Sequence, residues 1–279
     1  MSVPLRLDAP AKLNLDLRVV GRRDDGFHEL ESTLVLLELA DQLLLMPGCS
    51  GLRVEGRDAG ELPLDASNLA WRGLEVGLGG PPDLACLTIE KRIPVAAGLG
   101  GGSSDAAAAW RLGKGWRSLP DGAPSREETA RLVAIGADVP FFAAGMAAAR
   151  VGGIGEVVDP IEPIPAEVVL VHPPFGLRTA DVFAELRLDE WGSAMNDLAD
   201  AARRLRPELD DLFEAVRGAG ADPRLTGSGP TIFTVDDDPE RADDLAGRLA
   251  RQRLRVTRTR TRAAAATIHR IDDPPEEEP

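Results

Sequence analysis

The chain has 279 residues, enough for one or two domains with a sizeable core, and its 46 acidic and 32 basic side chains give a net charge of −14. Such an acidic balance argues against nucleic acid as a partner, because binding its phosphates needs a net basic surface. The two cysteines are too few for a disulfide framework, and no signal-peptide core or 18-residue apolar run occurs, so the sequence predicts a soluble cytoplasmic protein that does not bind membranes.

Apolar residues in alternation predict strands in the first part of the chain. The alternation covers residues 4–20, with an interruption at Pro10, and strand character resumes over residues 34–45. Lys12 and Asn14 stand two positions apart in the first strand, so their side chains point to one face of the sheet. A phosphate or another polar substrate would supply partners for them, whereas a solvated sheet face accounts for the same pattern equally well.

The most informative segment is PVAAGLGGGSSDAAAA at residues 94–109. It connects the apolar run at residues 87–93 to an alanine-rich helix, for which Ser103 or Ser104 is the predicted N-cap. Glycine lets backbone amides approach an anion, and the helix dipole favours negative charge at the same point, so the segment predicts a phosphate site. It is neither a Walker A loop nor a dinucleotide fingerprint. A flexible linker is the alternative, but a linker would not run straight into an N-capped apolar helix.

Two further helices are predicted on either side of this loop. Residues 68–78 carry leucines on one side, and residues 125–135 begin with Ser125 as N-cap and Glu128 in capping-box register. Asp138 follows a glycine and precedes Val-Pro in an apolar setting. A turn-forming role is the default explanation for an aspartate in such a place.

Strands and helices alternate in the second half of the chain. The proline-rich residues 159–165 are the best candidate for a domain boundary. The glycine turn TGSGP at residues 226–230 is either a tight hairpin or bulge, or a second loop around a shared anionic ligand. Beyond the boundary, strands are predicted over residues 168–172, 225–235 and 254–261, and helices over residues 179–186, 196–217 and 239–252.

A strand-led first half and an alternating second half predict an α+β protein of two lobes with a cleft between them. We expect an N-terminal domain over residues 1–158 and a C-terminal domain over residues 159–265. The acidic residues 266–279 are predicted to be a disordered tail.

Three segments resemble, in order, the motifs of the GHMP kinases, the family of galactokinase, homoserine kinase, mevalonate kinase and phosphomevalonate kinase. They lie at residues 10–15, 94–107 and 225–230, and the resemblance extends over residues 7–261. It implies the two-lobed GHMP kinase fold, with a strand-rich α/β N-terminal domain, a ferredoxin-like C-terminal domain and an active site in the cleft. The blocks GRRDDGFHE and GLGGGSSDA are similar to those GHMP kinases that use ATP to phosphorylate the 2-hydroxyl of cytidyl-diphospho-methylerythritol, on the non-mevalonate route to isoprenoids.

The resemblance implies a role for each motif residue. Asp138 matches the general base of the family. Lys12 matches the lysine that stabilises developing negative charge and keeps the aspartate ionised. Phe27 and Phe183 would stack on the two faces of the cytosine, and Phe27 stands where the family usually has tyrosine. The implied ATP site comprises Asn68, near the adenine, and Pro94, Val95, Ala96, Ala97, Gly98, Leu99, Gly100, Gly101, Gly102, Ser103 and Ser104. The implied substrate site comprises Asn14, Phe27, His28, Thr179, Phe183, Gly227, Ser228 and Gly229.

Mg²⁺ is expected to arrive with ATP, and no protein ligand is assigned to it. Asp105 is the carboxylate nearest to the loop, and we expect it to stabilise the helix N-terminus instead. The protein is expected to be a monomer or a weak homodimer. Another GHMP small-molecule kinase, of homoserine or mevalonate type, is one alternative, which the Phe27–His28 block disfavours. A relative that only binds a ligand is the other, and the presence of both Lys12 and Asp138 argues against it.

Overall fold

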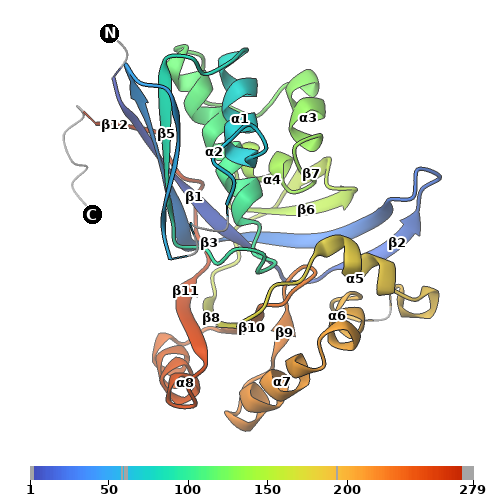
Figure 1. The fold of residues 1–279 in the computed structure, drawn as a ribbon. Helices are drawn as coiled ribbons and strands as arrows, with labels where there is room; N and C mark the ends of the chain where they lie inside the picture. Colours follow the sequence, from blue (N-terminus) through green and yellow to red (C-terminus); the bar gives the residue numbers. More distant parts are fainter. Residues whose placement is uncertain (1–2, 58, 60–61, 193, 272–279) are drawn as a thin grey trace.

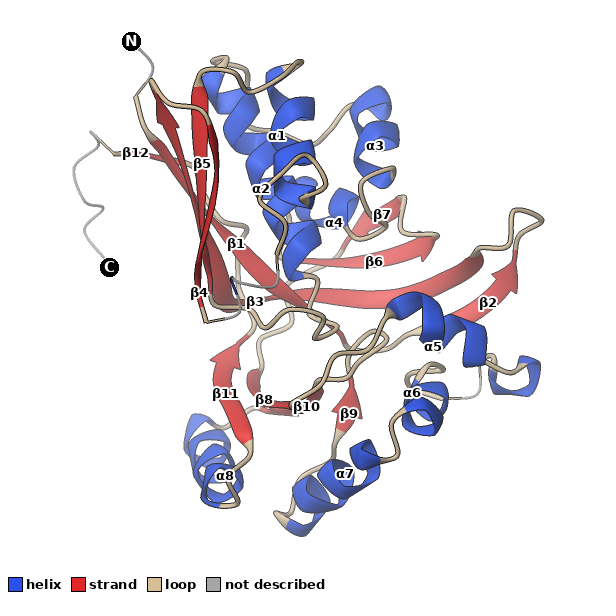
Figure 2. Ribbon diagram, viewed as in Figure 1, coloured by secondary structure: helices blue, strands red, loops and turns tan. Residues whose placement is uncertain are grey.

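The computed structural model describes residues 3–57, 59, 62–192 and 194–271, and it contains two β-sheets with helices packed against them (Figure 1). Eight strands form the first sheet, in the path β12-β1-β3-β5-β4 with β2, β6 and β7 beside β3. Helices α1 to α4 lie together on one of its faces (Figure 2). The strands are β1 (Leu5–Asn14), β2 (Arg18–Arg22), β3 (His28–Pro47), β4 (Gly51–Gly56), β5 (Ala85–Lys91), β6 (Ala148–Gly153), β7 (Val157–Pro160) and β12 (His269–Arg270), and the helices are α1 (Leu69–Leu78), α2 (Gly101–Trp116), α3 (Arg126–Val133) and α4 (Val139–Ala143).

Strand β3 is longer than the predicted residues 34–45. Its first part pairs with β2 and β6 and its second part with β1 and β5, so one strand spans the whole sheet. The sequence does not predict the first residues of β3 as a strand, because several of them are polar and they are partly exposed. Pro10 does not interrupt β1 as predicted, because a register shift between Pro10 and Lys12, typical of a β-bulge, accommodates it within the strand.

The second sheet has four antiparallel strands in the order β11-β8-β10-β9, which confirms the two-lobed α+β prediction. The helix predicted over residues 196–217 is two helices, because Pro207 has no backbone N–H and its ring clashes with the preceding turn. The strands are β8 (Glu167–His172), β9 (Arg224–Leu225), β10 (Ile232–Asp236) and β11 (Arg255–Arg260), and the helices are α5 (Thr179–Glu185), the 3₁₀ turn η2 (Leu188–Glu190), α6 (Ala199–Leu205), α7 (Glu208–Gly218) and α8 (Pro239–Arg251).

A shared apolar core joins the two sheets. Leu13, Val35 and Leu37 of the first sheet are buried in one cluster with Val168 and Phe233 of the second. One apolar core therefore continues from the first lobe into the second. It lies under the end of β1, which carries the polar side chains of Lys12 and Asn14.

After β11 the chain returns to the first sheet. The backbone N–H of Arg262 donates a hydrogen bond to the carbonyl oxygen of Leu36, and β12 pairs with the start of β1. Residues 269–270 of the predicted disordered tail thus form part of this sheet, which corrects the prediction for them, and residues 272–279 lie outside the described residues. The two cysteines, Cys49 before β4 and Cys86 in β5, form a disulfide. None of the described helices is both long enough and apolar enough to cross a membrane.

Helices α1 and α2 approach closely along a seam of glycines. A Cβ atom on Gly73 would lie 2.0 Å from the carbonyl oxygen of Ala106, and one on Gly77 would lie 2.2 Å from that of Trp110. Only glycine permits this approach. Asn68, the first residue of the predicted helix, is the N-cap of α1 and accepts a hydrogen bond from Ala70 N at 2.9 Å. The predicted capping box of α3 is also present.

Candidate active site

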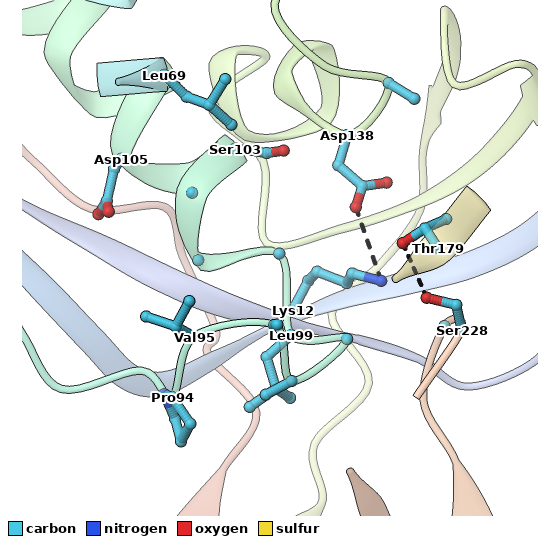
Figure 3. A pocket seen from close by; sticks show the side chains of 18 of the residues that line it. Lys12, Leu69, Pro94, Val95, Leu99, Ser103, Asp105, Asp138, Thr179 and Ser228 are labelled. Carbon is cyan, nitrogen blue, oxygen red and sulfur yellow. Dashed lines mark hydrogen bonds and ion pairs between the residues drawn. The ribbon is translucent and has the colours of Figure 1, made fainter. Parts of the chain in front are cut away.

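A cavity of about 570 Å³ lies where the motif segments meet (Figure 3). It is lined by the ends of β1 and β5, the loop between β5 and α2, the turn before α4, helix α5 and the turn between β9 and β10. Every predicted site residue lines it except Ser104, Phe27, His28 and Gly229. The structure therefore brings together residues that the sequence places in six separate segments.

The glycine loop ends in the N-terminus of α2, which begins earlier than predicted. Gly100, not Ser103 or Ser104, is the N-cap, with a positive φ of 71° and no side-chain cap. The prediction was wrong because a left-handed glycine turns the chain into the helix before the serines are reached. The amides at the start of α2 have no partner within the helix, so they can bind an anion. Ser104 lies inside the helix and is buried.

Gly98 brings the loop against the second glycine turn. Its φ is 75°, and a Cβ atom there would lie 2.6 Å from the carbonyl oxygen of Thr226 and 2.7 Å from that of Gly229. A side chain at this position would push the two loops apart. Gly98 therefore couples the turn between β9 and β10 to the N-terminus of α2.

Lys12 and Asp138 face one another across the cavity (Figure 3). Lys12 Nζ lies 3.8 Å from Asp138 Oδ2 and also donates to Asn14 Oδ1. The Lys12 side chain is 5% exposed and that of Asp138 is 38% exposed. Burial lowers the pKa of Lys12, and the charge of Asp138 opposes this effect only in part. Asp138 stands at the N-cap of α4 but makes no capping hydrogen bond, so its carboxylate is directed to the lysine.

Two asparagines hold the polar end of the cavity in place. The side chain of Asn14 donates to Ser32 Oγ at 2.7 Å. The amide of Asn196 donates to the carbonyl oxygens of Leu225 at 2.8 Å and Gly227 at 2.9 Å, and thereby fixes the second glycine turn. No role is assigned to Asn196 from the sequence, because only its tertiary contacts show what it holds.

Helix α5 contributes to the cavity from the second lobe. Thr179 Oγ1 lies 3.0 Å from Ser228 Oγ, so the helix is connected to the second glycine turn (Figure 3). The ring of Phe183 stacks on His28, with ring centroids 5.1 Å apart, and Trp191 meets His28 edge-on. Phe27 is 60% exposed, in the turn between β2 and β3. Burial, followed by the charge of Arg22, lowers the pKa of His28.

Asp105 does not stabilise the helix N-terminus as predicted. It is buried on the side of α2 that faces β5, and its Oδ2 lies 2.7 Å from Lys91 Nζ. The prediction failed because it considered only the helix that carries Asp105 and not the strand packed beside it. Within the described residues, no group of three or more His, Cys, Asp or Glu side chains is arranged to hold a metal ion.

Comparison with known proteins gives consistent matches. Models of the "GHMP kinases N terminal domain" and of "GHMP kinases C terminal" match residues 68–146 and 180–255. A 4-diphosphocytidyl-2-C-methyl-D-erythritol kinase of Paracoccus denitrificans is 37% identical over 90% of this chain and 93% of its own. A crystal structure of 4-(cytidine 5'-diphospho)-2C-methyl-D-erythritol kinase superimposes with a TM-score of 0.76 at 33% identity, covering 92% of this chain and 98% of its own. A homoserine kinase from Cytophaga hutchinsonii, 17% identical with a TM-score of 0.62 over 96% of this chain and 97% of its own, shares the fold.

Proposed function

The chain belongs to the GHMP kinase family, among its 4-diphosphocytidyl-2-C-methyl-D-erythritol kinases, and from this premise we propose how the residues of its cavity act. The protein is an ATP-dependent kinase of the non-mevalonate route to isoprenoids. It transfers a phosphoryl group from ATP to the 2-hydroxyl of 4-diphosphocytidyl-2-C-methyl-D-erythritol. The observation that supports this reaction best is the Lys12–Asp138 pair, which lines the same cavity as the N-terminus of α2.

We infer that the amides at the start of α2 hold the ATP phosphates, where the helix dipole favours negative charge. The acceptor hydroxyl then attacks the γ-phosphorus, its proton passes to the carboxylate of Asp138, and the bond to the ADP oxygen breaks. The ammonium of Lys12 stabilises the charge that develops during transfer. Its burial strengthens this interaction, because little water screens it.

Asn68 has a different part in the ATP site. Its side chain is engaged with Ala70 N and with the carbonyl oxygen of Pro63, at 2.9 and 2.8 Å. We propose that Asn68 holds the segment at residues 62–69 as one wall of the adenine pocket, along with Leu69. Phe27 and His28 are not part of the cavity lining, but His28 stacks on Phe183, which is, so we propose that the cytosine binds at this group of rings.

The carboxylates of the cavity do not provide a dedicated magnesium site. Asp138 faces Lys12 and Asp105 is paired with Lys91, so each is engaged by a lysine. We therefore propose that Mg²⁺ binds as part of the ATP complex and is held by phosphate oxygens and water, which is common for this ion. We place the enzyme in the cytoplasm, where ATP is supplied, as a monomer or weak homodimer.

The direct test is phosphorylation of four candidate acceptors by the purified chain with Mg-ATP. We expect a product with 4-diphosphocytidyl-2-C-methyl-D-erythritol, phosphorylated at its 2-hydroxyl, and none with homoserine, mevalonate or galactose. A preference for homoserine or mevalonate would support another GHMP kinase activity in place of this one.

Gly98→Ala should weaken ATP binding about tenfold. An alanine at positive φ costs about 1–2 kcal/mol, and its Cβ atom would meet two carbonyl oxygens of the second glycine turn. The displaced loop would no longer present the α2 amides correctly. Calorimetry with a non-hydrolysable ATP analogue measures the change, and Gly80→Ala, with no atom within 4 Å of the new Cβ, is the control. Parent-like affinity in a folded Gly98→Ala protein would exclude Gly98 from the ATP site.

Phe183→Ala should raise the KM of the cytidyl substrate and leave that of ATP nearly unchanged. Stacking of a base on an aromatic ring contributes about 1–3 kcal/mol, which corresponds to about five- to 150-fold in affinity. Steady-state kinetics with each substrate varied in turn separates the two constants. The exposed Leu188→Ala serves as control. Equal increases in both KM values would show instead that Phe183 supports the cavity as a whole.

A further inference from the structure

A buried cluster of three charged side chains lies beside the ATP site. Lys91, at the end of β5, contacts Asp105 on α2 at 2.7 Å and is paired with Asp41 on β3. All three side chains are at most 5% exposed. Lys91 and Asp105 line the cavity, yet the transfer step described above uses neither of them.

The cluster connects both ends of the glycine loop. Asp41 Oδ1 accepts hydrogen bonds from the backbone N–H groups of Arg92 at 2.6 Å and Ile93 at 2.8 Å, where the loop leaves β5. Lys91 carries the connection to α2, where the loop ends. A Cβ atom on Gly101, the first residue of α2, would lie 3.4 Å from Lys91 Nζ. The ammonium therefore lies directly against the turn whose amides would face the phosphates.

The charges of the cluster give the two aspartates different roles. Burial raises the pKa of Asp105 to about 7; Lys91 opposes this shift and Asp41 adds to it. Burial alone would lower the pKa of Lys91, but the two carboxylates outweigh it and raise that pKa. Asp41 also accepts the two backbone N–H groups at the start of the loop, whereas Asp105 is the carboxylate whose charged form burial disfavours. Asp105 Oδ1 has no hydrogen-bond partner among the described residues.

We propose that Lys91 is a positioning residue for the nucleotide phosphates, which ties the first turns of α2 to β5 through Asp105 and the start of the loop to β3 through Asp41. The inference rests on the proposed function in taking ATP as the ligand of the α2 N-terminus. A buried ion pair adds little net stability compared with well-packed apolar residues. Its effect here is on geometry, because small displacements of positioning groups reduce rates and affinities strongly.

The test compares variants that keep or remove the connection. Asp105→Asn keeps an acceptor for Lys91 and resembles the protonated acid, so ATP-analogue affinity should stay within about twofold of the parent. Asp105→Leu is similar in volume but cannot accept, and the affinity should fall about tenfold or more. The triple variant Asp41→Asn with Lys91→Met and Asp105→Leu removes all three charges and keeps an acceptor for the backbone N–H groups of the loop, so it should fold and show the same loss. Calorimetry measures ATP-analogue binding, and kinetics measures the KM of the cytidyl substrate, which should change less than twofold.

The outcomes separate positioning from support of the fold. A purely structural cluster would lower the thermal stability of the leucine variants and leave the ATP affinity of the folded protein unchanged, which would overturn the proposal. A tenfold loss in Asp105→Asn would overturn it as well, since that variant keeps the hydrogen bond, and this result is available even if both leucine variants fail to fold. Failure of the parent to bind the ATP analogue would reject the proposed function and not the cluster alone.

Discussion

An Asp138→Asn enzyme should turn over about 10²–10⁴ times more slowly than the parent, the usual contribution of a general base. Asparagine keeps the shape and polarity of the side chain but cannot take the proton of the attacking hydroxyl. Because Asp138 makes no capping bond to α4, the substitution should leave the helix and its stability unchanged. The kcat with saturating ATP and cytidyl substrate is the quantity to measure.

The control for this variant is Asp222→Asn, whose side chain is 80% exposed and outside the cavity. It should have parent-like kcat. If Asp138→Asn also has a near-parent kcat, then Asp138 is an ordinary turn residue and the proton is accepted elsewhere.

Lys12→Met should lower kcat about 10²–10³-fold, the range found when one stabilising donor is removed from a charge-developing site. Methionine keeps an apolar stem and should retain the contact of this side chain with the glycine loop. That contact is close, because a Cβ atom on Gly100 would lie 3.0 Å from Lys12 Cγ.

The pH dependence of the rate offers a second test of Lys12. Burial lowers the pKa of Lys12, so the rate of the parent should fall on the alkaline side at a lower pH than an ordinary lysine would cause. That alkaline limb should be absent in Lys12→Met.

The double variant Asp138→Asn with Lys12→Met distinguishes cooperation from independent action. Residues that act as a unit lose far less in combination than the product of their single losses. We expect this behaviour because the ammonium and the carboxylate lie 3.8 Å apart. Losses that multiply in the four-protein cycle would mean that each residue acts on its own.

The parts of the site that could be predicted are those whose residues lie close together in the sequence. Lys12 and Asn14 share one strand face, and the glycine loop precedes a helix, so spacing alone indicates where they point. The N-cap was missed because serine and glycine both favour that position, and only the backbone angle at Gly100 decides between them.

The partners of Asp105 could not be predicted in this way. Lys91 precedes it by 14 residues and Asp41 precedes Lys91 by 50, so only the packing of α2 on the first sheet brings them together. Asn196 lies 31 residues before the carbonyl group of Gly227 that it holds, and its role depends likewise on tertiary contact. Sequence patterns describe the face of an element well, but they do not identify the neighbour that covers it.

The return of the chain to the first sheet affects how the protein is made. Ala266 and Ile268, which follow the second lobe in sequence, pack into the core of the first lobe, and β12 pairs with the edge of β1. During synthesis the first lobe emerges from the ribosome long before these residues do, with that edge unpaired and part of its core open. The N-terminal lobe can reach its final form only after nearly the whole chain has been translated, so the two lobes complete their folding together although their sequences are consecutive.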